Sequence, residues 1–200
     1  MTGLPTDALQ VVLVIDASGS MAGAPLEAAK AAAGAFLATV RPGTQVAAVG
    51  FGNEPFVVSP FTADPSALSA ALVGIQARGE TALYDALTVA ARQFPADAPA
   101  RRSVVLVSDG GDTRSTGTLE AAAAALQDAG AGLTAVVLAT AESDPAALER
   151  LAGATGGTVV AGTDPAALAG VYEAIASQLA NQYRLTFRSE VGGRPSCASR

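Results

Sequence analysis

The stretch L-Q-V-V-L-V-I-D-A-S-G-S-M, residues 9–21, joins an apolar run to a polar loop. The run at residues 9–15 is typical of a strand that is buried on both faces of a parallel sheet. One carboxylate and two hydroxyls follow at alternate positions, as Asp16, Ser18 and Ser20. Oxygen-bearing side chains where a buried strand ends indicate a binding site at the carboxyl edge of a sheet.

Apolar runs and helical patterns alternate along the rest of the chain. The short G-N-E-P link after the second apolar run favours an antiparallel hairpin over a parallel crossover, which needs more residues. We expect strands at 9–16, 44–51, 56–59, 103–108, 133–138 and 158–161, and helices at 26–40, 65–75, 81–94, 118–129, 145–154 and 165–182. This order predicts an α/β domain with a doubly wound, mostly parallel six-stranded sheet and helices on both faces.

The predicted domain occupies residues 9–182, and residues 183–200 form a C-terminal tail of different character. The tail begins with Y-R-L-T-F, which alternates as a strand does, and continues as a polar segment rich in Gly and Ser. We therefore expect it to be the start of a following module.

The amino-acid composition argues against several classes of function. A net charge of −6 disfavours nucleic acid as a partner, because such proteins normally present a basic face. The chain has no histidine, which excludes Ser-His-Asp triads and histidine-based zinc sites. It contains no apolar run of about 18 residues, so we expect no membrane span in this chain. The N-terminal residues lack the basic region of a signal peptide, although the chain can be a fragment of a larger exported protein.

A second predicted strand, at 103–108, also ends in polar residues, S-D-G-G-D, which include Asp109. Ligands of open α/β sheets bind outside the carboxyl ends of the strands, where the strand order reverses. If the two strands are neighbours there, Asp16 and Asp109 face one crevice, and Thr81 of the G-E-T segment lies at the same end. These side chains and the two serines offer only hard oxygen ligands, which suit Mg²⁺ or Ca²⁺ rather than zinc or copper.

The combination of D-x-S-x-S, a distant G-x-T and a distant S-D-G resembles the metal-ion-dependent adhesion site of the von Willebrand factor A family. The resemblance covers residues 9–181 and implies a sheet of order 3-2-1-4-5-6 with strand 3 antiparallel. It implies that two serines bind the metal directly, that the threonine does so in the ligand-bound state, and that the aspartates bind directly or through water. The five implied ligands are Asp16, Ser18, Ser20, Thr81 and Asp109.

The function that this resemblance implies is a protein-interaction module for adhesion or assembly. The module binds Mg²⁺, or alternatively Mn²⁺ or Ca²⁺, and through the ion an exposed Asp or Glu of a partner protein. We expect the rim that faces the partner to include Met21, Glu80, Gly110 and Asp112. The alternatives are packing for Met21, loop capping for Asp112 and simple solvent exposure for Glu80.

The sequence leaves two other functions open: a Mg²⁺-dependent enzyme that handles phosphoesters, and a metal-free scaffold. We predict no enzyme, because the chain lacks a phosphate-binding loop motif, a dinucleotide fingerprint and a nucleophile elbow. Its one lysine, Lys30, lies inside a predicted helix, away from the site. The stretches D-A-S-G-S-M-A-G-A-P-L, R-G-E-T-A-L-Y-D-A-L and L-A-N-Q-Y-R-L-T-F resemble bacterial domains of this family, which commonly belong to larger cell-surface or secretion-related membrane proteins. This resemblance implies a cell-surface location and leaves a cytoplasmic one open.

Overall fold

The computed structural model describes residues 8–96, 100–109, 111–138 and 145–162. The predicted last helix at 165–182, the tail at 183–200 and the rim residue Gly110 lie outside these residues. The elements are β1 (Leu9–Asp16), a 3₁₀ turn η1 (Gly19–Met21), α1 (Ala24–Thr39), β2 (Gln45–Phe51), β3 (Pro55–Thr62), α2 (Pro65–Val73), α3 (Leu83–Gln93), β4 (Arg101–Ser108), α4 (Leu119–Asp128), β5 (Ala131–Leu138), α5 (Pro145–Ala154) and β6 (Thr158–Gly162).

The six strands form one sheet in the order β3-β2-β1-β4-β5-β6. β3 pairs with β2 in the antiparallel direction, and the other neighbouring strands are parallel. β1 lies at the centre, where Leu13 is opposite Ala48 of β2 and Val105 of β4. The predicted strand order and the antiparallel third strand are therefore confirmed.

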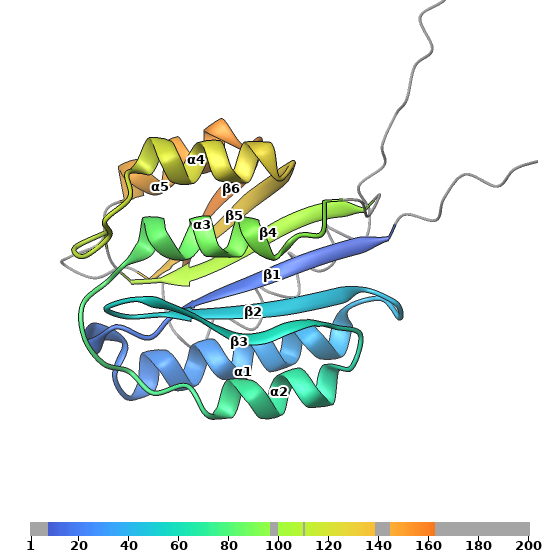
Figure 1. Cartoon of the computed structure of the whole chain (residues 1–200). Helices are drawn as coiled ribbons and strands as arrows, with labels where there is room; N and C mark the ends of the chain where they lie inside the picture. The colour runs from blue at the N-terminus through green and yellow to red at the C-terminus, as the bar shows by residue number, and fades with distance from the viewer. Residues whose placement is uncertain (1–7, 97–99, 110, 139–144, 163–200) are drawn as a thin grey trace, which may run out of the picture.

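Helices cover both faces of the sheet, α1 and α2 on one and α3, α4 and α5 on the other (Figure 1). β1 explains the layering, because successive side chains of a strand point to opposite faces. Val11, Leu13 and Ile15 belong to the core under α1 and α2, whereas Val12 and Val14 belong to the core under α3, α4 and α5. All five are completely buried, as a strand between two helical layers requires.

Most elements begin or end one to three residues from the predicted bounds, and three of these differences are informative. β3 is longer than the predicted 56–59 and runs from Pro55 to Thr62 across Pro60. Proline is tolerated there because β3 is an edge strand, whose missing N–H need not break a ladder bond. β4 begins at Arg101, two residues before the predicted start at residue 103. α3 begins at Leu83, so Thr81 belongs to the preceding loop and not to the helix.

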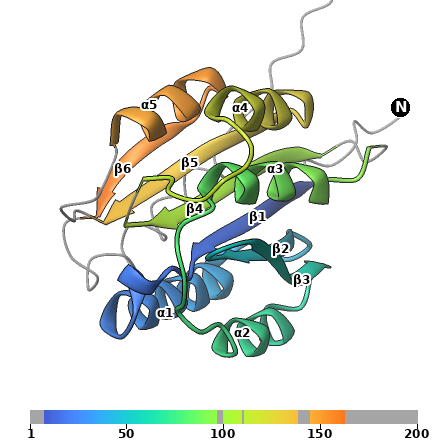
Figure 2. The same ribbon diagram turned by 60° about the vertical axis from the view of Figure 1, so that its left-hand side comes forward.

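The order of the strands places β1 and β4 side by side at the point where the chain reverses direction across the sheet. The loops after β1 and β4 and the segment that leads into α3 meet at this edge (Figure 2). The polar residues that the sequence places in these loops therefore belong to one region of the molecule.

Candidate metal centre

Asp16 ends β1 in a fixed orientation. The backbone N–H of Ser18 donates to Asp16 Oδ1 at 2.8 Å, and the hydroxyl of Ser108 donates to Oδ2 at 2.5 Å. The first bond is the local turn that an Asp makes with the backbone two residues later. The second comes from the last residue of β4. The carboxylate is thus held between the two central strands.

The two serine hydroxyls and Asp109 form a continuous polar chain. Ser18 Oγ lies 3.0 Å from Ser20 Oγ, and Ser20 Oγ donates to Asp109 Oδ1 at 3.0 Å. The 3₁₀ turn η1 makes this geometry, because it brings the side chains of residues 18 and 20 to the same side of the loop. The structure therefore brings four of the five predicted ligands together across two strands.

Thr81 is connected to the same loops through its backbone. Its N–H donates to Thr113 Oγ1 at 3.0 Å, and its carbonyl accepts from the N–H groups of Thr113 and Arg114 at 3.0 and 3.2 Å. Two residues earlier, the carbonyl of Gly79 accepts from the N–H of Gly19 at 2.9 Å. Hydrogen bonds thus join all three ligand-bearing loops. Within the part of the chain that the structure describes, the Thr81 hydroxyl itself makes no hydrogen bond.

Two carboxylates with little access to solvent stand near each other at this edge, since Asp16 is 0% exposed and Asp109 is 2% exposed. Burial raises the pKa of Asp16, hydrogen bonds from Ser108 and Ser18 lower it in part, and the charge of Asp109 raises it further. The groups that contact the Asp16 carboxylate are neutral donors, without a cationic side chain among the described residues. A divalent cation fits this environment because it supplies the missing positive charge.

The side chains available as ligands indicate which kind of cation the site would bind. Among the described residues, no three carboxylate, imidazole or thiolate side chains come together. A cation here would depend on the hydroxyls of Ser18, Ser20 and Thr81 in addition to Asp16 and Asp109. Hydroxyl and carboxylate oxygens are the ligands of hard cations such as Mg²⁺, Mn²⁺ and Ca²⁺. The residues present therefore fit the ion that the sequence predicts.

The predicted rim residues differ in their surroundings. Glu80 is exposed and forms a 3.3 Å ion pair with Arg114. Asp112 is half-buried and holds the loop after β4, because its carboxylate accepts from the backbone of Tyr84 and from Ser115. Met21 is completely buried in the core under α1 and α2, so its position matches packing and we do not keep it in the rim.

The structure also shows supporting residues that the sequence analysis did not single out. Ser108 orients Asp16, and Thr113 holds the backbone of Thr81. Ser108 was part of the S-D-G motif, yet its role could be seen only once β4 was placed beside β1. Thr113 carried no signal, because a lone threonine in a polar loop is common.

Asp85 on α3 is a further supporting residue. Its carboxylate accepts from the N–H and hydroxyl of Thr116 and from the N–H of Gly117, at 2.9 to 3.1 Å. Partial burial opposes ionisation, but these hydrogen bonds outweigh it and hold the pKa of Asp85 below its ordinary value of 3.8. The loop after β4 is therefore clamped to α3.

We expect Asp85→Asn to lower the free energy of unfolding by about 1 kcal/mol near neutral pH, because charge-assisted hydrogen bonds become neutral ones. A lowered pKa in the folded state stabilises above the ordinary pKa of 3.8, and this contribution disappears as the pH falls through the folded value. Urea unfolding of both proteins at several pH values should show a difference that shrinks in acid. A difference in the free energy of unfolding that grew in acid would contradict this role of the ionised Asp85 carboxylate.

A sequence model of the von Willebrand factor type A domain matches residues 11–112, just over half of the 200-residue chain. The chain therefore belongs to the von Willebrand factor type A domain family. The fold and the position of the polar loops agree with this assignment, since the six-stranded sheet has the order expected for the family.

Individual relatives extend the comparison. A curated relative, the UPF0353 protein of Mycolicibacterium paratuberculosis, is 31% identical over 122 residues, which cover 56% of this chain and 37% of that protein. The solved structure of a von Willebrand factor type A protein from Catenulispora acidiphila is 27% identical, with a TM-score of 0.78, over 86% of this chain and 43% of that one. The chain thus spans less than half the length of both proteins.

Proximal thread matrix protein 1 from the mussel byssus shares the fold at 19% identity. Its TM-score is 0.75, and the match covers 86% of this chain and 45% of that one. That structure is described as having a zinc-occupied MIDAS motif, a metal-ion-dependent adhesion site, so one protein of the same fold binds a divalent cation at such a site.

Proposed function

We propose that this chain is a metal-dependent protein-interaction module. A divalent cation, preferably Mg²⁺, is held by Asp16, Ser18, Ser20, Thr81 and Asp109. An acidic side chain of a partner protein completes the coordination of this cation. The observation that carries this proposal is the 3.0 Å contact of Ser20 with both Ser18 and Asp109, beside the buried carboxylate of Asp16. These groups come from loops far apart in the sequence.

The burial pattern indicates the side from which a partner approaches. Asp16 and Ser18 are buried, whereas Ser20 is exposed, so the open face of the site lies on the side of η1 that carries Ser20. Mg²⁺ prefers six ligands and keeps some of them as water. Three of the five protein ligands are neutral hydroxyls, which leaves the ion with enough positive charge to attract a further carboxylate.

The enzyme alternative lacks support at the site. Phosphoryl transfer needs a cationic clamp and a group that positions the nucleophile. The one lysine, Lys30, is paired with Glu27 on α1, and no cationic side chain of the described residues contacts the Asp16 carboxylate. Ser18 and Ser108 hold the Asp16 carboxylate through hydrogen bonds from neutral donors. We therefore infer that the chain binds and does not catalyse.

No helix in the described residues is both long and apolar enough to cross a bilayer. The chain also spans only part of the relatives that it matches. We propose that the domain acts within a larger surface or membrane protein, as its resemblance to bacterial domains of that kind suggests. Placement of the domain at the cell surface, by labelling of intact cells, tests this part of the proposal.

The interaction proposal is tested by selecting a displayed library of disulfide-constrained random peptides on the immobilised domain in Mg²⁺. Peptides released by a chelator should contain an Asp or Glu in nearly every sequence, because a carboxylate completes the metal centre. The matched control is a Ser18→Ala/Ser20→Ala double variant, which should yield no chelator-released pool. Equal pools from the two proteins would contradict the proposed function.

A further inference from the structure

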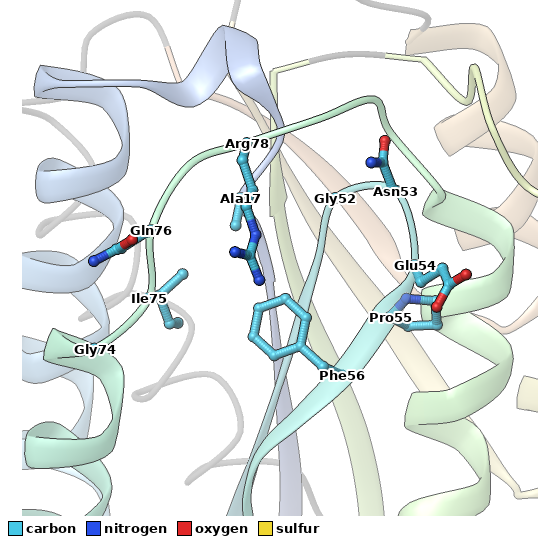
Figure 3. A pocket seen from close by; sticks show the side chains of 10 residues that line it. All are labelled: Ala17, Gly52, Asn53, Glu54, Pro55, Phe56, Gly74, Ile75, Gln76 and Arg78. Carbon is cyan, nitrogen blue, oxygen red and sulfur yellow. The ribbon is translucent and has the colours of Figure 1, made fainter.

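A pocket of about 560 Å³ opens next to the proposed metal centre (Figure 3). It lies between the β2–β3 turn and the segment at residues 74–78, which leads from α2 toward Thr81. Its lining includes Ala17, Phe56, Ile75 and Arg78. None of these residues is among the proposed metal ligands, so the pocket is a separate feature of the same edge of the sheet.

The pocket and the metal centre are joined through the loop after β1. Ala17 lines the pocket and stands between Asp16 and Ser18 in the chain. Its carbonyl accepts from the N–H of Arg78 at 2.7 Å. A Cβ on Gly52 would lie 2.5 Å from the carbonyl oxygen of Arg78, so a glycine at that position permits this close approach. A partner segment seated on the metal is thus within reach of the pocket.

Arg78 gives the pocket its chemistry. Lys30, Arg114 and Arg150 each form an ion pair, whereas the Arg78 side chain has neither an ion pair nor a hydrogen bond within the described residues. Figure 3 shows its guanidinium inside the pocket and the carboxylate of Glu54 at the opposite end, pointing away. In a chain of net charge −6, an uncompensated arginine beside a metal site favours a negatively charged ligand.

Phe56 supplies an apolar surface beside this cation. Its ring rests on Gly50, its cross-strand partner in β2, where a Cβ would lie 2.5 Å from the ring. The side chain is nevertheless 42% exposed, and its ring points into the pocket below Arg78 (Figure 3). Together the two side chains match an acidic residue with an aliphatic stem, which is the chemistry of glutamate.

We propose that this pocket binds a second acidic side chain of the partner segment whose first carboxylate completes the metal centre. The second carboxylate pairs with Arg78, and its methylene groups pack on Phe56. The proposal rests on the proposed function, and it narrows the partner to a protein segment with two acidic residues a few positions apart. Arg78 thereby selects among the acidic segments that the metal alone would accept.

The test repeats the peptide selection in Mg²⁺ on wild type, on Arg78→Gln and on Arg92→Gln. Arg92 lies exposed in the last turn of α3, outside the pocket, so its replacement makes the same change in charge. Wild type and Arg92→Gln should enrich peptides with a second acidic residue at a fixed spacing from the first. The Arg78→Gln pool should keep the first acid and lose the second.

Synthetic peptides from the wild-type pool then measure the effect. Arg78→Gln should lower the affinity for a peptide with two acidic residues about three- to fivefold, the range of an exposed ion pair, and Arg92→Gln should leave this affinity unchanged. Replacing the second acid by its amide should remove the difference between wild type and Arg78→Gln. A chelator-released pool with a single acid for every protein would overturn the pocket proposal and leave the metal function standing. Failure to obtain any chelator-released pool would overturn both.

Discussion

Replacing Asp16 with asparagine is expected to make the metal-free domain more stable. The same substitution should abolish the additional stability that Mg²⁺ gives to wild type. Asp16 is completely buried, its contacts are neutral donors, and Asp109 adds a like charge nearby. An asparagine of almost the same volume keeps an acceptor for the Ser18 N–H and removes the buried charge. We expect a gain of about 1–3 kcal/mol in the free energy of unfolding without metal.

Thermal unfolding in chelator and in excess Mg²⁺ measures both effects. Wild type should be stabilised by the ion, by about 2.7 kcal/mol at a concentration one hundred times its dissociation constant, and the variant should not respond. Glu149→Gln, which removes an exposed carboxylate of α5, is the matched control and should behave as wild type. An Asp16→Asn protein that is less stable than wild type in chelator would show that the carboxylate has a structural role instead.

Replacing Gly79 with alanine is expected to lower stability by about 2–3 kcal/mol and to weaken metal binding about tenfold. Gly79 has a φ of +81°, and a Cβ there would lie 2.5 Å from Asn53 Oδ1, which accepts from the N–H of Glu80. Its carbonyl also accepts from Gly19 N–H, so a shift of this loop moves both the serine loop and Thr81. Urea unfolding and Mn²⁺ titration measure the two losses.

Gly43→Ala is the matched control for this variant. Gly43 has a φ of +87°, but a Cβ there would meet no atom within 4 Å. It lies in the turn between α1 and β2. The control should therefore lose only about 1 kcal/mol from backbone strain and keep its affinity for metal. If both variants lost metal affinity equally, Gly79 would have no particular link to the site.

Most of the fold could be predicted because its signals are local. The uninterrupted apolar run of β1 indicates burial on both faces, and the short link before β3 indicates an antiparallel pair. The ends of β3 and α3 were placed less well. The length of β3 depends on its pairing with β2 as an edge strand, and the start of α3 depends on bonds between Thr81 and the loop after β4. Neither is encoded by local propensity.

The predicted ligands were recognisable because their residue types stand at the ends of two strands. Four of them lie together in the structure, and the fifth, Thr81, lies in a loop bonded to the other two. The supporting roles of Ser108 and Thr113 escaped prediction, because they act on residues 92 and 32 positions away in the chain, where tertiary packing and not local sequence sets the pairing. The pocket beside the site escaped for the same reason.

A calorimetric titration of Mn²⁺ and Mg²⁺ into the chelator-stripped domain, beside the Ser18→Ala/Ser20→Ala variant, shows whether these side chains hold a cation. We expect saturable binding to one site on wild type and its loss in the variant, while circular dichroism shows that the variant keeps its fold. Equal binding to both proteins, or no binding to wild type at saturating metal, would contradict a cation held by Asp16, Ser18, Ser20, Thr81 and Asp109.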